Sequence, residues 1–223
     1  TAVWLLPIVA CEVAASSGGL LLAHLPAQAH AVHILLGSYL LWGISVFPAF
    51  AILSILLLRL ALHQLPSKEM AISSWLALGP IGTGALALLL LGEQAPRILT
   101  AVDLVDLGQV LLQGGMFAAF VLLGFGVWWF GIAILITLKH LRDLPFNLGW
   151  WAMTFPFGVF SLAVINLAEH TQLNAIQQCG NFFAVLLCTL WLLVMLKTIQ
   201  GFYCGTLFFS PCLKAYHEAQ SAS

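Results

Sequence analysis

A single carboxylate, Glu12, lies inside the first long apolar segment of this sequence. Burying a carboxyl group in an apolar helix is costly, so a residue of this kind is by default a candidate for function. Glu12 could carry a proton, or it could be a neutral carboxylic acid that is hydrogen-bonded to a backbone group. We therefore treat Glu12 as a candidate proton-coupling residue.

A second candidate is residues 146–158, where a pair of tryptophans precedes the run Phe155-Pro156-Phe157. Proline has no N–H and clashes with the preceding helical turn, so a helix bends or breaks there. Tryptophan favours the interface of a bilayer, and irregular backbone at membrane depth is tolerated only against protein or a wet cavity. The segment therefore predicts a spanning helix whose break lines a pore or substrate path.

Further prolines and glycines occur in the other apolar segments. Freed carbonyls and small residues at helix breaks can contact a permeant ion, and small residues can equally serve close helix packing. The candidate pore-lining residues are Pro7, Pro80, Pro156, Gly18, Gly79, Gly82 and Gly158.

The remaining reactive residue types show no spacing typical of a catalytic or metal site. His24, His30 and His33 are scattered around the first predicted outer turn, a pattern more typical of an interface than of metal ligands. No nucleophile triad, phosphate-binding glycine loop or zinc motif is present, so we predict no catalytic residue, metal or cofactor. Five cysteines without a CxxC pair are expected to be free thiols: Cys11, Cys179, Cys188, Cys204 and Cys212.

Composition indicates the surroundings in which these residues work. Of the 223 residues, 62% are hydrophobic and only 7% are charged. A soluble domain of this size would need an apolar surface, and the apolar runs are too long for the strands of a membrane barrel. The net charge of -1 and the lack of a basic patch give no reason to expect a nucleic-acid partner. The sequence predicts an all-α polytopic membrane protein.

Six apolar runs each exceed the ~20 residues that a helix needs to cross a bilayer. They cover about 2–22, 34–58, 70–92, a part of 107–138, 148–168 and 171–196. We expect one transmembrane domain, 1–223, with three hairpins at about 2–58, 70–138 and 148–196. Residues 201–203 should extend the sixth span or lie in the interface. No basic region precedes the first span, so no signal peptide is expected.

The basic residues predict the orientation. Six of the seven fall on one side of the membrane: Arg59, Lys68, Lys139, Arg142, Lys197 and Lys214. Arg97 falls on the other side, in outer loops that also hold the acidic residues Glu93, Asp103, Asp106 and Glu169. The positive-inside rule then places both ends of the chain in the cytoplasm.

The odd-numbered spans share an internal repeat. Each begins with tryptophan and reaches proline a few residues later, at Pro7, Pro80 and Pro156, which are spaced by 73 and 76 residues. The repeating unit is a hairpin of a proline-broken helix and a plainer return helix. Three copies predict a quasi-symmetric ring around a pore, with spans one, three and five as the inner layer.

Three motifs carry a resemblance to a known family. They are PFNLGWW with TFPFG at 145–158, LPIVA with SGG at 6–19, and LGPIGTG at 78–84. They resemble the odd helices of the tellurite-resistance/dicarboxylate transporter family, which includes plant slow anion channels, bacterial tellurite-resistance proteins, and yeast malate and sulfite transporters. The family has ten helices in five hairpins around a pore, and the six spans here resemble helices five to ten. Three hairpins alone would not close that pore.

The resemblance implies an anion channel or transporter. The substrates would be small inorganic anions, C4-dicarboxylates, sulfite or tellurium oxyanions, and the protein would be a homotrimer in a bacterial inner membrane. Phe155 resembles the family's gating phenylalanine, and Phe157 is its local competitor. An ionised Glu12 in the lumen would repel anions, so it must be protonated, paired or off the path. The alternative is an intramembrane enzyme or a cofactor-binding subunit, which would be expected to pair histidines between facing spans.

Overall fold

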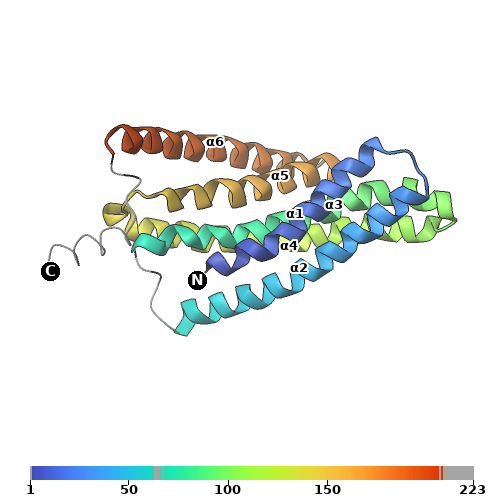
Figure 1. Cartoon of the computed structure of the whole chain (residues 1–223), viewed down its shortest axis with the longest axis horizontal. Helices are drawn as coiled ribbons and strands as arrows, with labels where there is room; N and C mark the ends of the chain where they lie inside the picture. The colour runs from blue at the N-terminus through green and yellow to red at the C-terminus, as the bar shows by residue number, and fades with distance from the viewer. Residues whose placement is uncertain (1, 63–65, 67, 206, 208–223) are drawn as a thin grey trace, which may run out of the picture.

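The computed structural model describes residues 2–62, 66, 68–205 and 207. Over these ranges six long helices follow one another (Figure 1): α1 Leu5–His24, α2 Ala29–Leu62, α3 Leu78–Leu99, α4 Val105–His140, α5 Thr154–Thr171 and α6 Asn174–Tyr203. With their flanking 3₁₀ turns, all six are long and apolar enough to cross a membrane. The all-α polytopic fold predicted from the apolar runs is confirmed.

Several helices extend beyond the apolar runs that predicted them. α3 continues past the apolar run through Glu93 and Arg97, because Ala95, Ile98 and Leu99 keep burying one face of the helix. The prediction that Glu93 and Arg97 lie in an outer loop was therefore wrong. Asp106 and Glu169 likewise belong to helices, α4 and α5. At the other end of the chain, α6 continues to Tyr203, so residues 201–203 do extend the sixth span.

Arg97 has a structural role at the end of the bundle where α1 turns into α2. Its guanidinium donates hydrogen bonds to the carbonyl of Leu22 at 2.5 Å and to that of Leu25 at 2.8 Å. Leu22 lies in the last turn of α1 and Leu25 is its C-cap residue, whose N–H also donates to the Leu22 carbonyl at 3.3 Å. The last carbonyls of a helix lack the i+4 N–H partners of its interior, so they can accept from a side chain. Arg97 therefore caps α1 from α3, which explains a basic residue on the side of the membrane that has few.

The three odd-numbered spans begin in the same way. A 3₁₀ segment leads directly into each α-helix: η1 Ala2–Trp4 into α1, η2 Lys68–Ala77 into α3, and η5 Leu148–Met153 into α5. The repeated prolines, Pro7, Pro80 and Pro156, are each the third residue of the α-helix. The break that the prolines predicted within each odd span is therefore a change from 3₁₀ to α geometry. The prolines lie in the first turn of the α-helix, where backbone N–H groups have no partner within the helix, so the N–H that proline lacks costs little stability.

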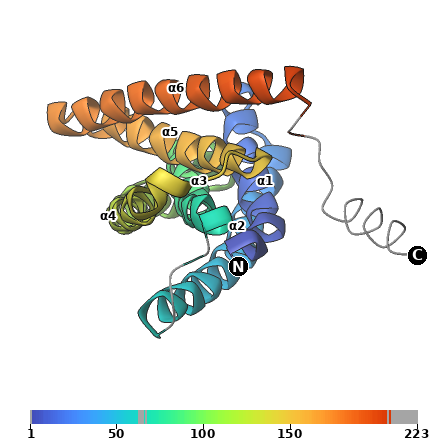
Figure 2. The same cartoon turned by 90° about the vertical axis from the view of Figure 1, so that its left-hand side faces the viewer.

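The helices pack around α3. It contacts α1, α4 and α5, and its spanning segment is wholly buried. Figure 2, which looks along the bundle, shows α3 in the middle with α4, α5 and α1 around it. α1 and α5 are more buried than α2, α4 and α6, as expected if the odd spans form the inner layer. α1 contacts α3, and α3 contacts α5, so the odd helices lie side by side. That they form part of a closed ring stays a prediction.

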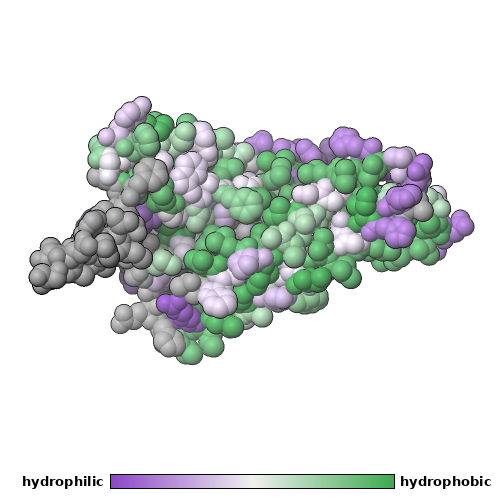
Figure 3. Space-filling model, in the orientation of Figure 1, coloured by the Kyte–Doolittle hydropathy of each residue, from purple (hydrophilic) through white to green (hydrophobic). Residues whose placement is uncertain are grey.

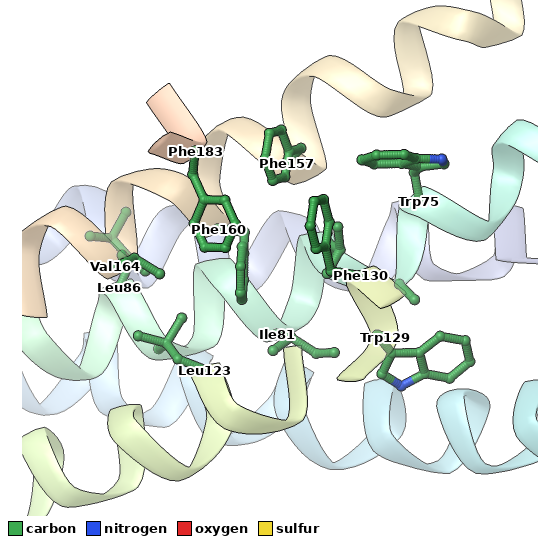
Figure 4. Packing of buried hydrophobic residues seen from close by; sticks show 14 of the residues in the cluster. Trp75, Ile81, Leu86, Leu123, Trp129, Phe130, Phe157, Phe160, Val164 and Phe183 are labelled. Atoms are coloured by element: carbon green, nitrogen blue, oxygen red, sulfur yellow. The ribbon is translucent and has the colours of Figure 1, made fainter. Parts of the chain in front are cut away.

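Aromatic side chains fill the core between α3, α4, α5 and α6. Phe157 stacks on Phe130 with ring centroids 5.1 Å apart, and Trp75 and Phe183 meet its ring edge to face. Figure 4 shows these rings clustered beside Phe160. Offset and edge-to-face pairs of this kind add stabilisation beyond the area that they bury. The cluster fixes the start of α5 against η2 and α4.

The outer surface is that of a protein in lipid. Figure 3 shows apolar side chains across the middle of the molecule, with hydrophilic ones gathered toward the end where α1 turns into α2 and α3 turns into α4. Many large apolar side chains are exposed, among them Leu40, Phe47, Phe117, Val185 and Leu196. These five lie on the even-numbered helices, and α1 and α5 also expose apolar side chains, such as Leu20 and Leu162.

Candidate functional site

A groove runs over the starts of the three odd helices. Its walls come from α1, from the η2–α3 junction and from the η5–α5 junction. It consists of two adjoining hollows of about 290 and 550 Å³ that share Leu6, Leu76, Phe155 and Pro156. The deeper hollow is completed by Val9, Ala10, Val13 and Gly79, and the other reaches Ser73, Trp151 and Ala152. We call the two hollows together the groove.

The repeat places equivalent residues on the groove. Leu6, Gly79 and Phe155 each precede one of the three repeated prolines, and all three line the deeper hollow. The residues four before the prolines are Val3, Leu76 and Ala152, and all three line the adjoining hollow. In a regular helix a residue's N–H bonds the carbonyl four residues earlier, and proline cannot make that bond. The internal repeat of the sequence is thus a repeat of one site geometry.

Phe155 and its neighbour Phe157 have opposite surroundings. The side chain of Phe155 is 49% exposed, and it borders both hollows of the groove. Phe157 is 0% exposed and is held in the aromatic core (Figure 4). Phe155 also borders a third hollow, between α5 and α6, lined by Leu187 and Trp191. Of the two candidate phenylalanines, only Phe155 can contact a molecule in the groove.

The candidate glycines divide into one on the groove and three in packing contacts. A Cβ added to Gly79 would lie 3.7 Å from the Cβ of Pro156, an ordinary contact on the groove wall. A Cβ on Gly82 would lie 2.6 Å from the backbone nitrogen of Phe160, and one on Gly18 would meet the hydroxyl of Ser38. Gly158 faces Leu187 of α6. Gly18 and Gly82 therefore let helices approach one another, whereas a Cβ on Gly158 would make an ordinary contact at 3.6 Å. None of these three glycines lines the groove.

The prolines also differ from one another. Pro156 is buried and lines the groove. Pro80 is buried and Pro7 is exposed, and neither belongs to the walls of the groove. Their effect on the groove is indirect, since they set the backbone beside Gly79 and Leu6.

Glu12 lies off the groove, between α1, α2 and α3. It is 0% exposed, and its Oε2 accepts a hydrogen bond from the hydroxyl of Thr83 at 2.5 Å. The same hydroxyl is 2.7 Å from the carbonyl oxygen of Gly79, on the groove wall. The other carboxyl oxygen, Oε1, has no hydrogen-bond partner in the part of the chain that the structure describes. A hydroxyl has one hydrogen, so both contacts of Thr83 can be hydrogen bonds only if Glu12 is protonated and donates to Thr83.

Other polar groups surround this carboxyl. Ser45 donates to the carbonyl of Ile8 at 2.6 Å, and the indole N–H of Trp42 donates to that of Gly84 at 2.9 Å. Gly84 lies close to Glu12, because a Cβ on it would be 3.9 Å from Cδ of the carboxyl. No Lys, Arg or His among the described residues pairs with Glu12, and the hydrogen bonds of the cluster join α1, α2 and α3.

The predicted histidines take no part in the groove. His24, His30 and His33 are exposed at the end of α1 and the start of α2. Within the ranges that the structure describes, no three His, Cys, Asp or Glu side chains meet as metal ligands. Cys11, Cys179, Cys188 and Cys204 are free thiols, and Cys212 lies outside the described residues.

The described residues that line the groove carry no charge. Aliphatic and aromatic side chains dominate both hollows, and the polar groups at its rim are few, with Ser73 and Asn147 among them. A hydrated ion would find no counter-charge there and would have to shed water to pass Phe155. The geometry suits a hydrophobic constriction, not a tight binding site.

Comparison with known proteins identifies the family. The profile of the voltage-dependent anion channel family (SLAC1) matches residues 1–199. A sulfite efflux pump from Arthroderma otae is 37% identical over 203 residues, which are 89% of this chain and 53% of the pump. An uncharacterized transporter from Methanocaldococcus jannaschii is 30% identical over 92% of this chain and 57% of its own length.

A malic acid transport protein from Schizosaccharomyces pombe is 24% identical over 89% of this chain and 46% of its own length. This chain spans about half the length of the curated relatives that it matches. No solved structure matches it. Because the family profile covers most of the sequence, the resemblance seen in the motifs is confirmed, and the chain belongs to the SLAC1 family of voltage-dependent anion channels.

Proposed function

We propose that this protein moves small anions across a membrane along the groove, with the ring of Phe155 as the barrier. The observation that carries the proposal is the convergence of Leu6, Gly79 and Phe155 on one hollow. Phe155 is the largest of these three equivalent residues and offers a hydrated anion no hydrogen-bond partner. The hollow between α5 and α6 lies beside the same ring, which gives the ring space to turn aside.

Sulfite is the first substrate to test, since the sulfite efflux pump of Arthroderma otae has the highest identity among the relatives described above. Malate is the second, because the more distant Schizosaccharomyces pombe relative is a malic acid transport protein. Inorganic anions and tellurium oxyanions complete the set. Uncharged walls would distinguish anions by their size and by how easily they lose water. Which of these anions is transported is therefore a question for experiment.

Glu12 is proposed to carry a proton that moves with the anion. Its carboxyl reaches the groove wall through the hydroxyl of Thr83 and the carbonyl of Gly79. This position meets the requirement that a carboxylate be kept off an anion path. A neutral Glu12 that only braces the three helices is the competing role.

The remaining proposals concern the setting of the groove. We expect a single transmembrane domain in the inner membrane of a bacterium, with both ends of the chain in the cytoplasm and three copies in the assembly. The groove is open along one side, and nearly half of the Arthroderma otae pump lies outside the part that matches this chain.

The test is an anion flux assay. The purified protein is reconstituted into liposomes, and efflux of sulfite, malate, chloride, nitrate and tellurite is followed against protein-free liposomes. We expect flux of at least one of these anions, and of sulfite first. Liposomes that retain the whole panel while the protein is folded and inserted would contradict the proposal.

A further inference from the structure

A further cavity of about 170 Å³ lies between α2, η2 and α4. It adjoins the groove at Met70 and Ser73 of η2, which line both. This volume is several times the roughly 30 Å³ of one water molecule. The cavity reaches from Arg59, which is exposed in the last turn of α2, to the buried indole of Trp129 on α4. Leu56 and Leu60 of α2 form its apolar wall.

The indole N–H of Trp129 is an unused hydrogen-bond donor. Trp129 is 2% exposed, and among the described residues its Nε1 has no hydrogen-bond partner. In contrast, the indoles of Trp42, Trp75, Trp150 and Trp151 all donate to oxygen atoms of the protein at 2.9–3.1 Å. Figure 4 shows the nitrogen of Trp129 on the side turned away from the aromatic cluster. A buried N–H without a partner is costly, so an acceptor from outside the chain would find a ready donor here.

The other polar groups of the cavity favour an anionic ligand. No carboxylate among the described side chains pairs with Arg59. Ser73 and Ser74 already donate to the carbonyls of Met70 and Ala71, both at 2.7 Å. The free donors of the cavity are therefore a guanidinium at its mouth and an indole N–H at its base. Both donate and neither accepts, which matches a phosphate and an ester oxygen.

We propose that this cavity binds one anionic phospholipid from the leaflet in which Arg59 lies. Arg59 stands in the last turn of a spanning helix, the depth at which phospholipid phosphates lie. The phosphate pairs with the guanidinium, an ester oxygen accepts from Trp129, and an acyl chain leaves along the apolar wall of α2. The two polar groups that hold the lipid, Arg59 and Trp129, do not line the groove, so the proposal does not depend on transport through it.

The experiment measures lipid binding and thermal stability of the purified protein in detergent. Phosphatidylglycerol, phosphatidylcholine and inorganic phosphate are titrated, and bound lipid is counted by native mass spectrometry. We expect one retained phosphatidylglycerol and a higher melting temperature with it than with phosphatidylcholine or phosphate. Arg59→Gln should weaken this binding about tenfold, as loss of a charge-assisted contact predicts.

Two further variants separate the site from general effects. Arg142→Gln removes an exposed basic residue from η4 (Leu141–Asp143) that does not line the cavity, and it should leave lipid binding unchanged. Trp129→Phe keeps a ring and removes the N–H, so it should weaken retention in protein that still folds. Equal stabilisation by phosphatidylcholine, equal stabilisation by free phosphate, or unchanged binding in Arg59→Gln would each overturn the proposal.

Discussion

Gly79 and Pro156, on two different inner helices, lie side by side on the wall of the groove, where a Cβ added to Gly79 would be 3.7 Å from the Cβ of Pro156. The contact joins the second and third repeats at the point where each changes from 3₁₀ to α geometry. Three residues further along α3, Gly82 instead meets the backbone of Phe160. One glycine thus shapes the groove and the other closes a helix contact.

Gly79→Ala should fold normally and lower anion flux, because its methyl group fits beside Pro156 and narrows the groove. Gly82→Ala is the matched comparison, since the same methyl would lie 2.6 Å from the nitrogen of Phe160. Forcing α3 and α5 apart should cost about 1–3 kcal/mol of stability. Melting temperature and liposome flux measured on both variants test this. A Gly79→Ala protein with unchanged flux would place the path elsewhere.

Glu12→Gln should keep the fold, because an amide is close in size to the carboxyl and can still bond the hydroxyl of Thr83. It cannot take up or release a proton. Anion flux should persist in this variant, and proton movement with the anion, read by a pH dye inside the liposomes, should be lost. Proton movement equal to that of the wild type in Glu12→Gln would show that the carboxyl serves only to brace the helices.

Arg97→Lys should loosen the outer end of α1. The guanidinium bonds two backbone carbonyls at once, at 2.5 and 2.8 Å, and an ammonium group cannot reproduce that fork. Because Arg97 is exposed, the loss should be modest, about 1 kcal/mol. Hydrogen exchange at the end of α1 should speed up in this variant while the core of α3 stays protected. Equal protection of α1 in both proteins would contradict the capping role.

The orientation of the bundle can be read by cysteine labelling. Residue 68 begins η2 and residue 93 lies near the far end of α3, so they mark opposite ends of one span. In a background without native cysteines, Glu93→Cys should react with an impermeant reagent in whole cells, and Lys68→Cys only after permeabilisation. Labelling of Lys68→Cys from outside would reverse the topology.

Much of this fold could be predicted from local patterns. Continuous apolar runs gave the six spans, and the matched tryptophan and proline positions gave the repeat that converges on the groove. The ends of the helices were less predictable, because Glu93 and Arg97 look like loop residues until α3 is seen to bury the opposite face. The cap that Arg97 provides joins it to residues more than seventy positions away, and no local pattern reports such a contact.

The candidate site could be predicted only in part. Phe155 and Phe157 stand two residues apart in one apolar run, so only packing against Phe130 and Phe183 assigns Phe157 to the core. The roles of the glycines could not be predicted either. Gly79 and Gly82 lie in the same motif, and only the helix packing shows that Gly79 faces Pro156 on the groove and Gly82 faces the backbone of Phe160. Thr83, the partner of Glu12, was missed as a functional candidate because the two lie 71 residues apart and meet only through helix packing.

The central claim is that anions pass Phe155. Its most direct test is the flux of sulfite in liposomes for the wild type, Phe155→Ala and Phe157→Ala, each with its melting temperature. Removing the half-exposed ring of Phe155 should raise flux and leave the melting temperature nearly unchanged. Removing the fully buried ring of Phe157 should cost about 3–5 kcal/mol and give no gain in flux. Unchanged flux in a folded Phe155→Ala protein, or a gain from Phe157→Ala instead, would contradict the account.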